Sequence, residues 1–248
     1  MTHPLPTQED LRGNADPLLL VLAERILDFR AHHLHEGSDY HDAITNGQKP
    51  LAFVSQCIDG RQPVHTITAL PLGKLIAQSS IAGFLRDYPD SSAAWASILF
   101  SVKDLGTPVI IKLGHTGCGG VRKLIELCRD RVSVDEDANL DPTLEWLQSA
   151  LPLTQSVMAK NPGLSKADIE YALEQELVRD GVQKLERFIG RVIAEGHLAE
   201  AQRPSIVGLL FEMHTSKLYH LLPDGDFKLL SQTKAGLLHR ECGDHVKT

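Results

Sequence analysis

The sequence of 248 residues predicts an α/β fold with a mostly parallel central sheet, flanking helices and an N-terminal helical arm. Short, nearly continuous apolar segments recur along the chain, and such segments are typical of strands that are buried on both faces. Segments with helical spacing separate them, as expected where crossover connections join parallel strands. With 42% hydrophobic and 23% charged residues, the chain can also bury a sizeable core.

The predicted elements follow one another in chain order. Residues 17–35 carry leucine and isoleucine at helical spacing and predict the helix of the arm. Apolar runs predict four parallel strands, at 49–56, 74–79, 107–114 and 204–214. The run at 217–222 follows a Thr-Ser turn and predicts an antiparallel edge strand. Further helices are predicted at 91–105, at 119–129 and, interrupted at 161–163, at 142–200.

Charge and composition exclude several classes of protein. The formal net charge is −7, from 25 basic and 32 acidic residues, and no run of Lys or Arg exceeds two residues. This balance argues against nucleic acid or an anionic membrane as the main partner. The first residues lack the features of a signal peptide, and the longest apolar stretch, 17–23, is too short to cross a bilayer. We therefore expect a cytoplasmic protein whose four cysteines are metal ligands or free thiols.

Side chains suited to metal chemistry follow two of the predicted strands. Cys57, Asp59 and Arg61 alternate after the first strand, and His115 and Cys118 follow the third. In parallel sheets, ligands gather at the carboxyl ends of strands. Two cysteines and one histidine, with a fourth position left open, form the pattern of a catalytic zinc site. The alternative, two buried apolar thiols and a loop histidine, gives no reason for the carboxylate and the guanidinium.

The neighbouring glycines are consistent with such a site. Gly119 and Gly120 would allow the backbone to approach the metal closely. The start of the predicted helix at 119–129 would favour the thiolate form of Cys118.

The motif C-x-D-x-R begins at Cys57, and H-x-x-C-G-G begins 58 positions later at His115. The two motifs together resemble those of the β-class carbonic anhydrases. G-Q-K-P-L-A-F-V-S-Q-C resembles the first strand of that family, E-L-V-R-D-G-V-Q-K-L its Glu-Asn-Val helix, and S-I-V-G-L-L-F-E-M-H its last core strand. The resemblance covers about 45–225. It implies a zinc-binding α/β catalytic domain there, between an arm at 1–44 and a C-terminal extension at 226–248.

The resemblance also implies the role of each site residue. Asp59 would accept a hydrogen bond from zinc-bound water, or occupy the fourth coordination position in a closed form. Arg61 would pair with Asp59 and hold it off the metal, and Gln48 would donate to an oxygen of CO2 or bicarbonate. The ligands of one Zn²⁺ per chain would be Cys57, His115 and Cys118.

By the same resemblance, the protein would be a zinc lyase. It would hydrate CO2 reversibly to bicarbonate and a proton, using a zinc-bound hydroxide. It would assemble as a homodimer or a dimer of dimers, with the N-terminal helix reaching over the partner. Because two thiolates neutralise the ion, such a centre should acidify water less than an all-histidine site. We therefore expect activity to rise towards alkaline pH.

Several positions depart from the family pattern and leave alternatives open. In gapless register Ser79 and Ser80 stand where the family has Arg-Asn, whereas a shift of one residue would instead match Ala82 and Gly83. Phe100 stands where the family has a tyrosine. The predicted substrate pocket contains Ile76, Ile81, Phe100 and Gly119. Its apolar walls suit CO2, but they also suit COS or CS2. The alternatives are therefore a COS or CS2 hydrolase on the same scaffold and a catalytically weak zinc-binding scaffold protein.

A second set of candidate metal ligands lies near the C-terminus. His239, Cys242 and His245 follow one another at three-residue steps. They could clasp another metal, but we interpret them as part of a terminal tail.

Overall fold

The computed structural model describes residues 4–90, 92–130 and 141–230. The chain divides into two compact units. The smaller comprises Met1–Gln48 and Pro71–Lys74, and the larger comprises Lys49–Leu70 and Leu75–Thr248.

The smaller unit contains two helices, α1 (Asp16–His33) and α2 (Asp39–Asn46). Helix α1 has a proline in its first turn, where the missing N–H is tolerated. Helix α2 begins at Ser38, whose side chain accepts a hydrogen bond of 3.1 Å from the N–H of His41. Helix α1 buries only Val21 among its described side chains. Its exposed apolar side chains are Leu19, Leu20, Leu22, Ile26, Leu27 and Phe29.

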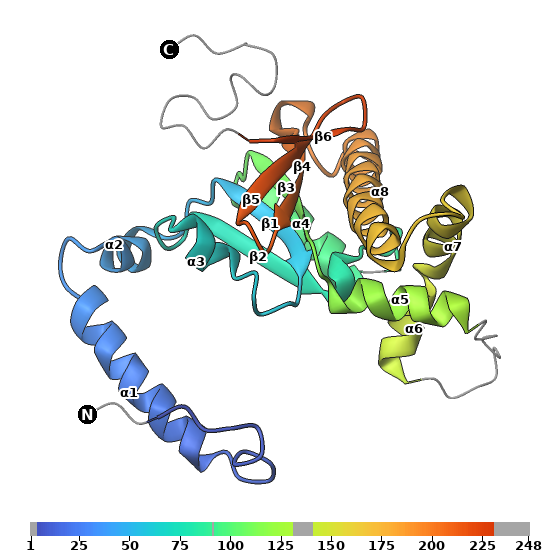
Figure 1. Cartoon of the computed structure of the whole chain (residues 1–248). Coiled ribbons are helices and arrows are strands. Elements are labelled where there is room, and N and C mark those ends of the chain that lie inside the picture. Colours follow the sequence, from blue (N-terminus) through green and yellow to red (C-terminus); the bar gives the residue numbers. More distant parts are fainter. Residues whose placement is uncertain (1–3, 91, 131–140, 231–248) are drawn as a thin grey trace. The chain divides into compact units, whose positions relative to one another are not determined.

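The larger unit is built on a six-stranded sheet with the order β2-β1-β3-β4-β5-β6 (Figure 1). Four strands are parallel: β1 (Ala52–Cys57), β2 (Leu75–Ser80), β3 (Val109–His115) and β4 (Ser205–Glu212). Strand β5 (Lys217–Leu221) and strand β6 (Phe227–Leu229) are each antiparallel to the strand before them. The predicted α/β class and mostly parallel sheet are therefore confirmed.

One detail of the predicted sheet is wrong. Strand β5 is antiparallel, as expected, but it does not form the edge, because β6 pairs along its outer side. Strand β6 has only three residues and lies in the range assigned to the C-terminal extension. Three residues are too few to show the alternation by which a strand is recognised.

Two long helices cover one face of this sheet. Helix α4 (Ser92–Lys103) and helix α8 (Lys166–Ala194) pack there around Phe53 of β1 and Ile110 of β3. The ring centroids of Trp95 and Phe188 lie 4.6 Å apart in this cluster. Ser165 caps helix α8, because its side chain accepts a hydrogen bond from the N–H of Asp168. The remaining helical elements of the larger unit are α3 (Val64–Thr68), η1 (Ile81–Gly83), α5 (Gly119–Arg129), α6 (Pro142–Gln148), α7 (Leu151–Lys160) and η2 (Glu200–Gln202).

The opposite face of the sheet is also apolar. Its buried cluster consists of the strand residues Ala52, Val54, Leu75 and Leu113. Within the described part of the larger unit, the helical residue that joins this cluster is Val64 of α3. A groove of about 300 Å³ runs over this face. The larger unit therefore presents an apolar sheet face with little helical cover of its own.

Strand register determines where the functional side chains meet. Strands β1 and β3 pair in parallel from Ala52 opposite Val109 to Ser55 opposite Lys112. Both strands then run on to their last residues, Cys57 and His115. The two ligand candidates therefore emerge at the same edge of the sheet.

The described helices include none with both the length and the hydrophobicity needed to span a membrane.

We expect Gly208→Ala to destabilise the protein. A Cβ at this position of β4 would lie 2.9 Å from Leu221 Cβ and 3.0 Å from Val182 Cγ2. Such overpacking typically lowers the free energy of unfolding by about 1–3 kcal/mol, measurable by urea denaturation. Gly190→Ala in α8 is the matched control, because its Cβ would meet nothing within 4 Å. That substitution should raise stability by roughly 0.5–1 kcal/mol, and equal effects of the two changes would contradict the packing argument.

Candidate metal centre

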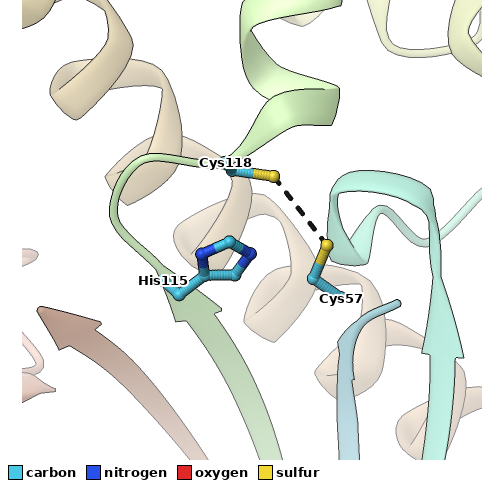
Figure 2. A group of neighbouring side chains, drawn as sticks. All are labelled: Cys57, His115 and Cys118. Carbon is cyan, nitrogen blue, oxygen red and sulfur yellow. Dashed lines mark hydrogen bonds between the residues drawn. The ribbon is translucent and has the colours of Figure 1, made fainter. Parts of the chain in front are cut away.

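Three ligand side chains meet at the carboxyl edge of the sheet. Cys57 ends β1, His115 ends β3, and Cys118 directly precedes α5. All three are buried, and their ligand atoms lie within 4.8 Å of one another. Figure 2 shows the imidazole beside the two sulfur atoms. The structure thus brings together the three residues predicted as metal ligands.

The spacing of the two sulfur atoms suits a tetrahedral ion. The Sγ atoms of Cys57 and Cys118 are 3.8 Å apart. Two thiolates that each lie about 2.3 Å from a tetrahedral Zn²⁺ would be separated by about 3.8 Å. The geometry therefore fits zinc without movement of either sulfur.

The imidazole of His115 is oriented as a metal ligand would be. Its Nδ1 lies 3.1 Å from the carbonyl oxygen of Thr116, a contact that orients the ring and leaves Nε2 available. Nε2 is buried and has no hydrogen-bond partner among the described residues. A buried nitrogen without a partner is costly, and a bound metal ion would satisfy it.

The two thiols influence each other's ionisation. Contact with Cys118 lowers the pKa of Cys57, and the same contact raises the pKa of Cys118, because the pair holds one proton between them. Burial opposes the charged form of His115, but the neighbouring Cys57 thiolate raises the pKa of this histidine. A proton or a metal ion is therefore favoured between these three groups.

Asp59 and Arg61 form a bidentate ion pair beside the three ligands. Arg61 Nε donates to Asp59 Oδ1 at 2.9 Å, and a terminal nitrogen of Arg61 donates to Oδ2 at 2.6 Å. These bonds hold the pKa of Asp59 well below its usual range. The same guanidinium donates to the carbonyl oxygen of Gly117 at 3.1 Å, which ties the pair to the loop before Cys118. Asp59 Oδ2 lies 3.9 Å from His115 Nε2, so an ionised carboxylate faces the candidate site.

Two supporting residues were not predicted. The backbone N–H of Cys118 donates to Glu174 Oε1 at 2.9 Å, and Gln62 Nε2 donates to the carbonyl oxygen of Gly114 at 3.2 Å. Burial raises the pKa of Glu174 to about 7, against the effect of the Cys118 N–H. The sequence contains one signal that Glu174 is buried, because this residue directly follows Leu173 on the apolar face of α8.

The two glycines after Cys118 differ in their surroundings, and their approach to a metal stays a prediction. A Cβ on Gly119 would meet nothing within 4 Å among the described residues. A Cβ on Gly120 would lie 2.9 Å from the backbone nitrogen of Ala82. Ala82 itself has a left-handed φ of 57°. Gly120 therefore permits close contact between α5 and η1.

The predicted pocket residues lie in separate places within one chain. Ile81 packs against the cluster that contains Cys57 and Cys118, Ile76 packs against the cluster around Trp95, and Phe100 on α4 is 55% exposed. Their roles, and that of Gly119, stay predictions. Gln48 is exposed and belongs to the smaller unit. It lies next to Gly73, because a Cβ added to that glycine would be 3.4 Å from the Cβ of Gln48.

The departures from the family pattern can also be placed. Ser80 Oγ donates to the carbonyl oxygen of Phe84 at 2.7 Å, and Ser79 Oγ accepts from Gln56 Nε2 at 3.4 Å. Both serines therefore have partners of their own. The candidate tail ligands His239, Cys242 and His245 lie outside the described residues.

We expect the protein to bind one divalent ion at this centre. Loading with Co²⁺ should produce sulfur-to-cobalt charge-transfer absorption, because thiolates are the ligands. Cys57→Ser should weaken this absorption, because only the Cys118 thiolate remains, and should lower the affinity by roughly 100-fold or more. Cys128→Ser is the control, since this thiol on α5 lies outside the group. Unchanged cobalt binding by Cys57→Ser would refute the site.

Known proteins resemble both the sequence and the fold. The carbonic anhydrase family model matches residues 52–218, which is more than half of the chain. Carbonic anhydrase 2 of Mycobacterium tuberculosis is 32% identical over 107 residues, covering 43% of this chain and 49% of that protein. The match therefore spans about half the length of that relative.

Solved structures agree on the fold. The β-carbonic anhydrase CcaA superposes with a TM-score of 0.70 at 18% identity, over 86% of this chain and 99% of its own. A structure from a study of two tetrameric β-carbonic anhydrases of the ascomycete Sordaria macrospora superposes with a TM-score of 0.61 at 19% identity, over 87% and 99%. Together with the family match and the buried Cys-His-Cys cluster, these likenesses show that the chain belongs to the β-carbonic anhydrase family.

Proposed function

We propose that this protein is a zinc-dependent lyase that interconverts CO2 and bicarbonate. The observation that carries the proposal is the group of three buried ligand atoms beside the ionised Asp59–Arg61 pair. Thiolate and imidazole ligands suit Zn²⁺, and the sulfur spacing fits it. Family membership supports the same reaction.

Each residue of the site would have a separate role in the reaction. Zn²⁺ held by Cys57, His115 and Cys118 would supply a Lewis acid that lowers the pKa of water. Asp59 Oδ2, kept ionised by Arg61, would accept a hydrogen bond at the open coordination position or occupy that position in a closed form. The hydrogen bond from Arg61 to the carbonyl oxygen of Gly117 would keep the Asp59 carboxylate in place.

The wall of the site would favour a small neutral substrate. Ile81 and Ile58 line a neighbouring cavity of about 530 Å³ together with Trp146. Its lining also has polar side chains, among them Gln78 and Asp90, and does not include the three ligand residues. We assign Ile76, Ile81, Phe100 and Gly119 to the substrate pocket, and Gln48 to the oxygen of CO2 or bicarbonate. The same apolar wall makes COS or CS2 hydrolysis the second candidate function, which competition between substrates would distinguish.

We expect stopped-flow assays to show CO2 hydration that rises from neutral to alkaline pH. Two thiolate ligands leave the zinc centre without net charge, so water should ionise there at higher pH than at an all-histidine site. Arg61→Met should lower kcat/KM by roughly 10–100-fold, because Asp59 loses its anchor. The absence of turnover at any pH, with one zinc bound per chain, would refute the proposal.

We also propose a cytoplasmic homodimer or dimer of dimers. Residues 1–44 would be an arm that covers the partner, 45–225 the catalytic domain and 226–248 an extension. Two apolar surfaces support this arrangement, the exposed leucines of α1 and the sheet face that carries the 300 Å³ groove. In the dimer, helix α1 of one chain would cover that face of the other, and Gln48 would serve the partner's zinc.

We expect the double change Leu19→Glu and Ile26→Glu to dissociate the oligomer. Both side chains are more than half exposed on α1, so the change should not disturb the folding of a single chain. Light scattering after size exclusion would show the mass of one chain instead of two or four. Lys160→Glu, an exposed change on α7, is the control and should leave the mass unaltered. A double variant that keeps the wild-type mass would contradict the proposed interface.

A further inference from the structure

Strand β6 ends the sheet beside β5 (Figure 1). It has three residues, whereas β5 has five and β4 has eight. Within the described part of the chain, no further strand pairs with its outer side. Neither the metal centre nor the two apolar surfaces of the proposed assembly include this strand.

Backbone hydrogen bonds hold β6 against β5 along its whole length. The strand runs antiparallel to residues 219–221. Before it, the N–H of Leu222 donates to the carbonyl oxygen of Asp226 at 2.8 Å. After it, the N–H of Leu230 donates to the carbonyl oxygen of Leu218 at 2.8 Å. The side of β5 that faces away from β4 is therefore bonded within the chain.

The turn before β6 and helix α8 fix the position of this strand. Gly225 in the turn has a left-handed φ of 93°, which glycine adopts without strain. Arg179 Nε on α8 donates to the carbonyl oxygen of Gly225 at 2.8 Å, and the guanidinium carbon lies 5.2 Å from the centroid of the Phe227 ring. Arg179 Nη1 also donates to Glu176 Oε2 at 3.1 Å. A residue of α8 thus holds both the turn and the strand.

The strand that β6 covers is suited to pairing with another chain. Its residues Leu218, Tyr219 and Leu221 favour strands, and its lysine, Lys217, stands at the first position. An uncovered edge strand of this kind offers unpaired N–H and C=O groups to a second chain. Strand β6 offers much less, because it is short and carries the exposed Lys228 at its centre.

We propose that β6 is a cap that keeps a second copy of this chain from pairing with β5. Such a copy would bind through its own β5, in an antiparallel pair with two-fold symmetry. With the cap in place, assembly of the protein uses other surfaces, such as α1 and the apolar sheet face. The inference goes beyond the proposed function, because it involves neither the metal centre nor the reaction.

The test compares Lys228→Pro with Lys228→Thr in the full chain. Hydrogen-bonded pairs alternate along an antiparallel ladder. Asp226 and Leu230 both belong to such pairs, so the residue between them does too. Proline removes the N–H of this residue and should detach β6. Threonine removes the charge but keeps the N–H and favours a strand, so it is the matched control.

The first readout is the mass in solution, from light scattering after size exclusion. We expect Lys228→Pro to have about twice the wild-type mass or more, rising with protein concentration. Lys228→Thr should keep the wild-type mass. Gly225→Val places a β-branched side chain at the left-handed φ and should act like Lys228→Pro. It provides the test if the proline variant does not fold.

The second readout is hydrogen exchange at the amide of His220, which lies opposite Lys228 in the ladder. This amide should stay protected in the associated variants, because a second chain takes the place of β6.

An unchanged mass in the folded variants would overturn the proposal. So would a higher mass with rapid exchange at His220, because the association would then lie elsewhere. An equal rise in mass for Lys228→Thr would also overturn it, since that variant keeps the cap. None of these outcomes depends on whether the protein hydrates CO2, so the inference and the proposed function can be refuted separately.

Discussion

The parallel pairing of β1 with β3 is the constraint on which the rest of the structure depends. Its register carries both strands to the same edge, so that Cys57 and His115 end side by side. The turn after β3 then returns Cys118 to the same point at the start of α5. A slip of one residue in either strand would turn the last side chain to the other face of the sheet and separate the ligands.

Buried polar groups around this edge are stabilised by specific partners rather than by solvent. Glu174 receives the backbone N–H of Cys118, Gln62 holds the carbonyl of Gly114, and Lys112 holds that of Gly83. Each bond fixes a backbone segment that carries or adjoins a ligand. His115 Nε2 is buried with no hydrogen-bond partner in the described part of the chain. A bound ion would complete the network at that atom.

The sequence predicted the features that depend on local pattern and paired motifs. The four parallel strands were recognisable from continuous apolar runs, and Cys57, His115 and Cys118 from their positions at two strand ends. Strand β6 was missed because three residues carry no periodicity. The part played by Gly120 could not be predicted, because it depends on where Ala82 lies in space. Lys112 and Gly181 are 69 positions apart in the sequence, and only packing reveals that one makes room for the other.

The tight fit between Gly120 and Ala82 couples parts of the site that the chain keeps far apart. The first turn of α5 touches the backbone of η1, and η1 follows the end of β2, where Ser80 pairs with Cys57. A displacement of this short loop would therefore be transmitted to both cysteines at once. The two sulfur ligands therefore share η1 as a common neighbour, which joins the end of β1 to the start of α5.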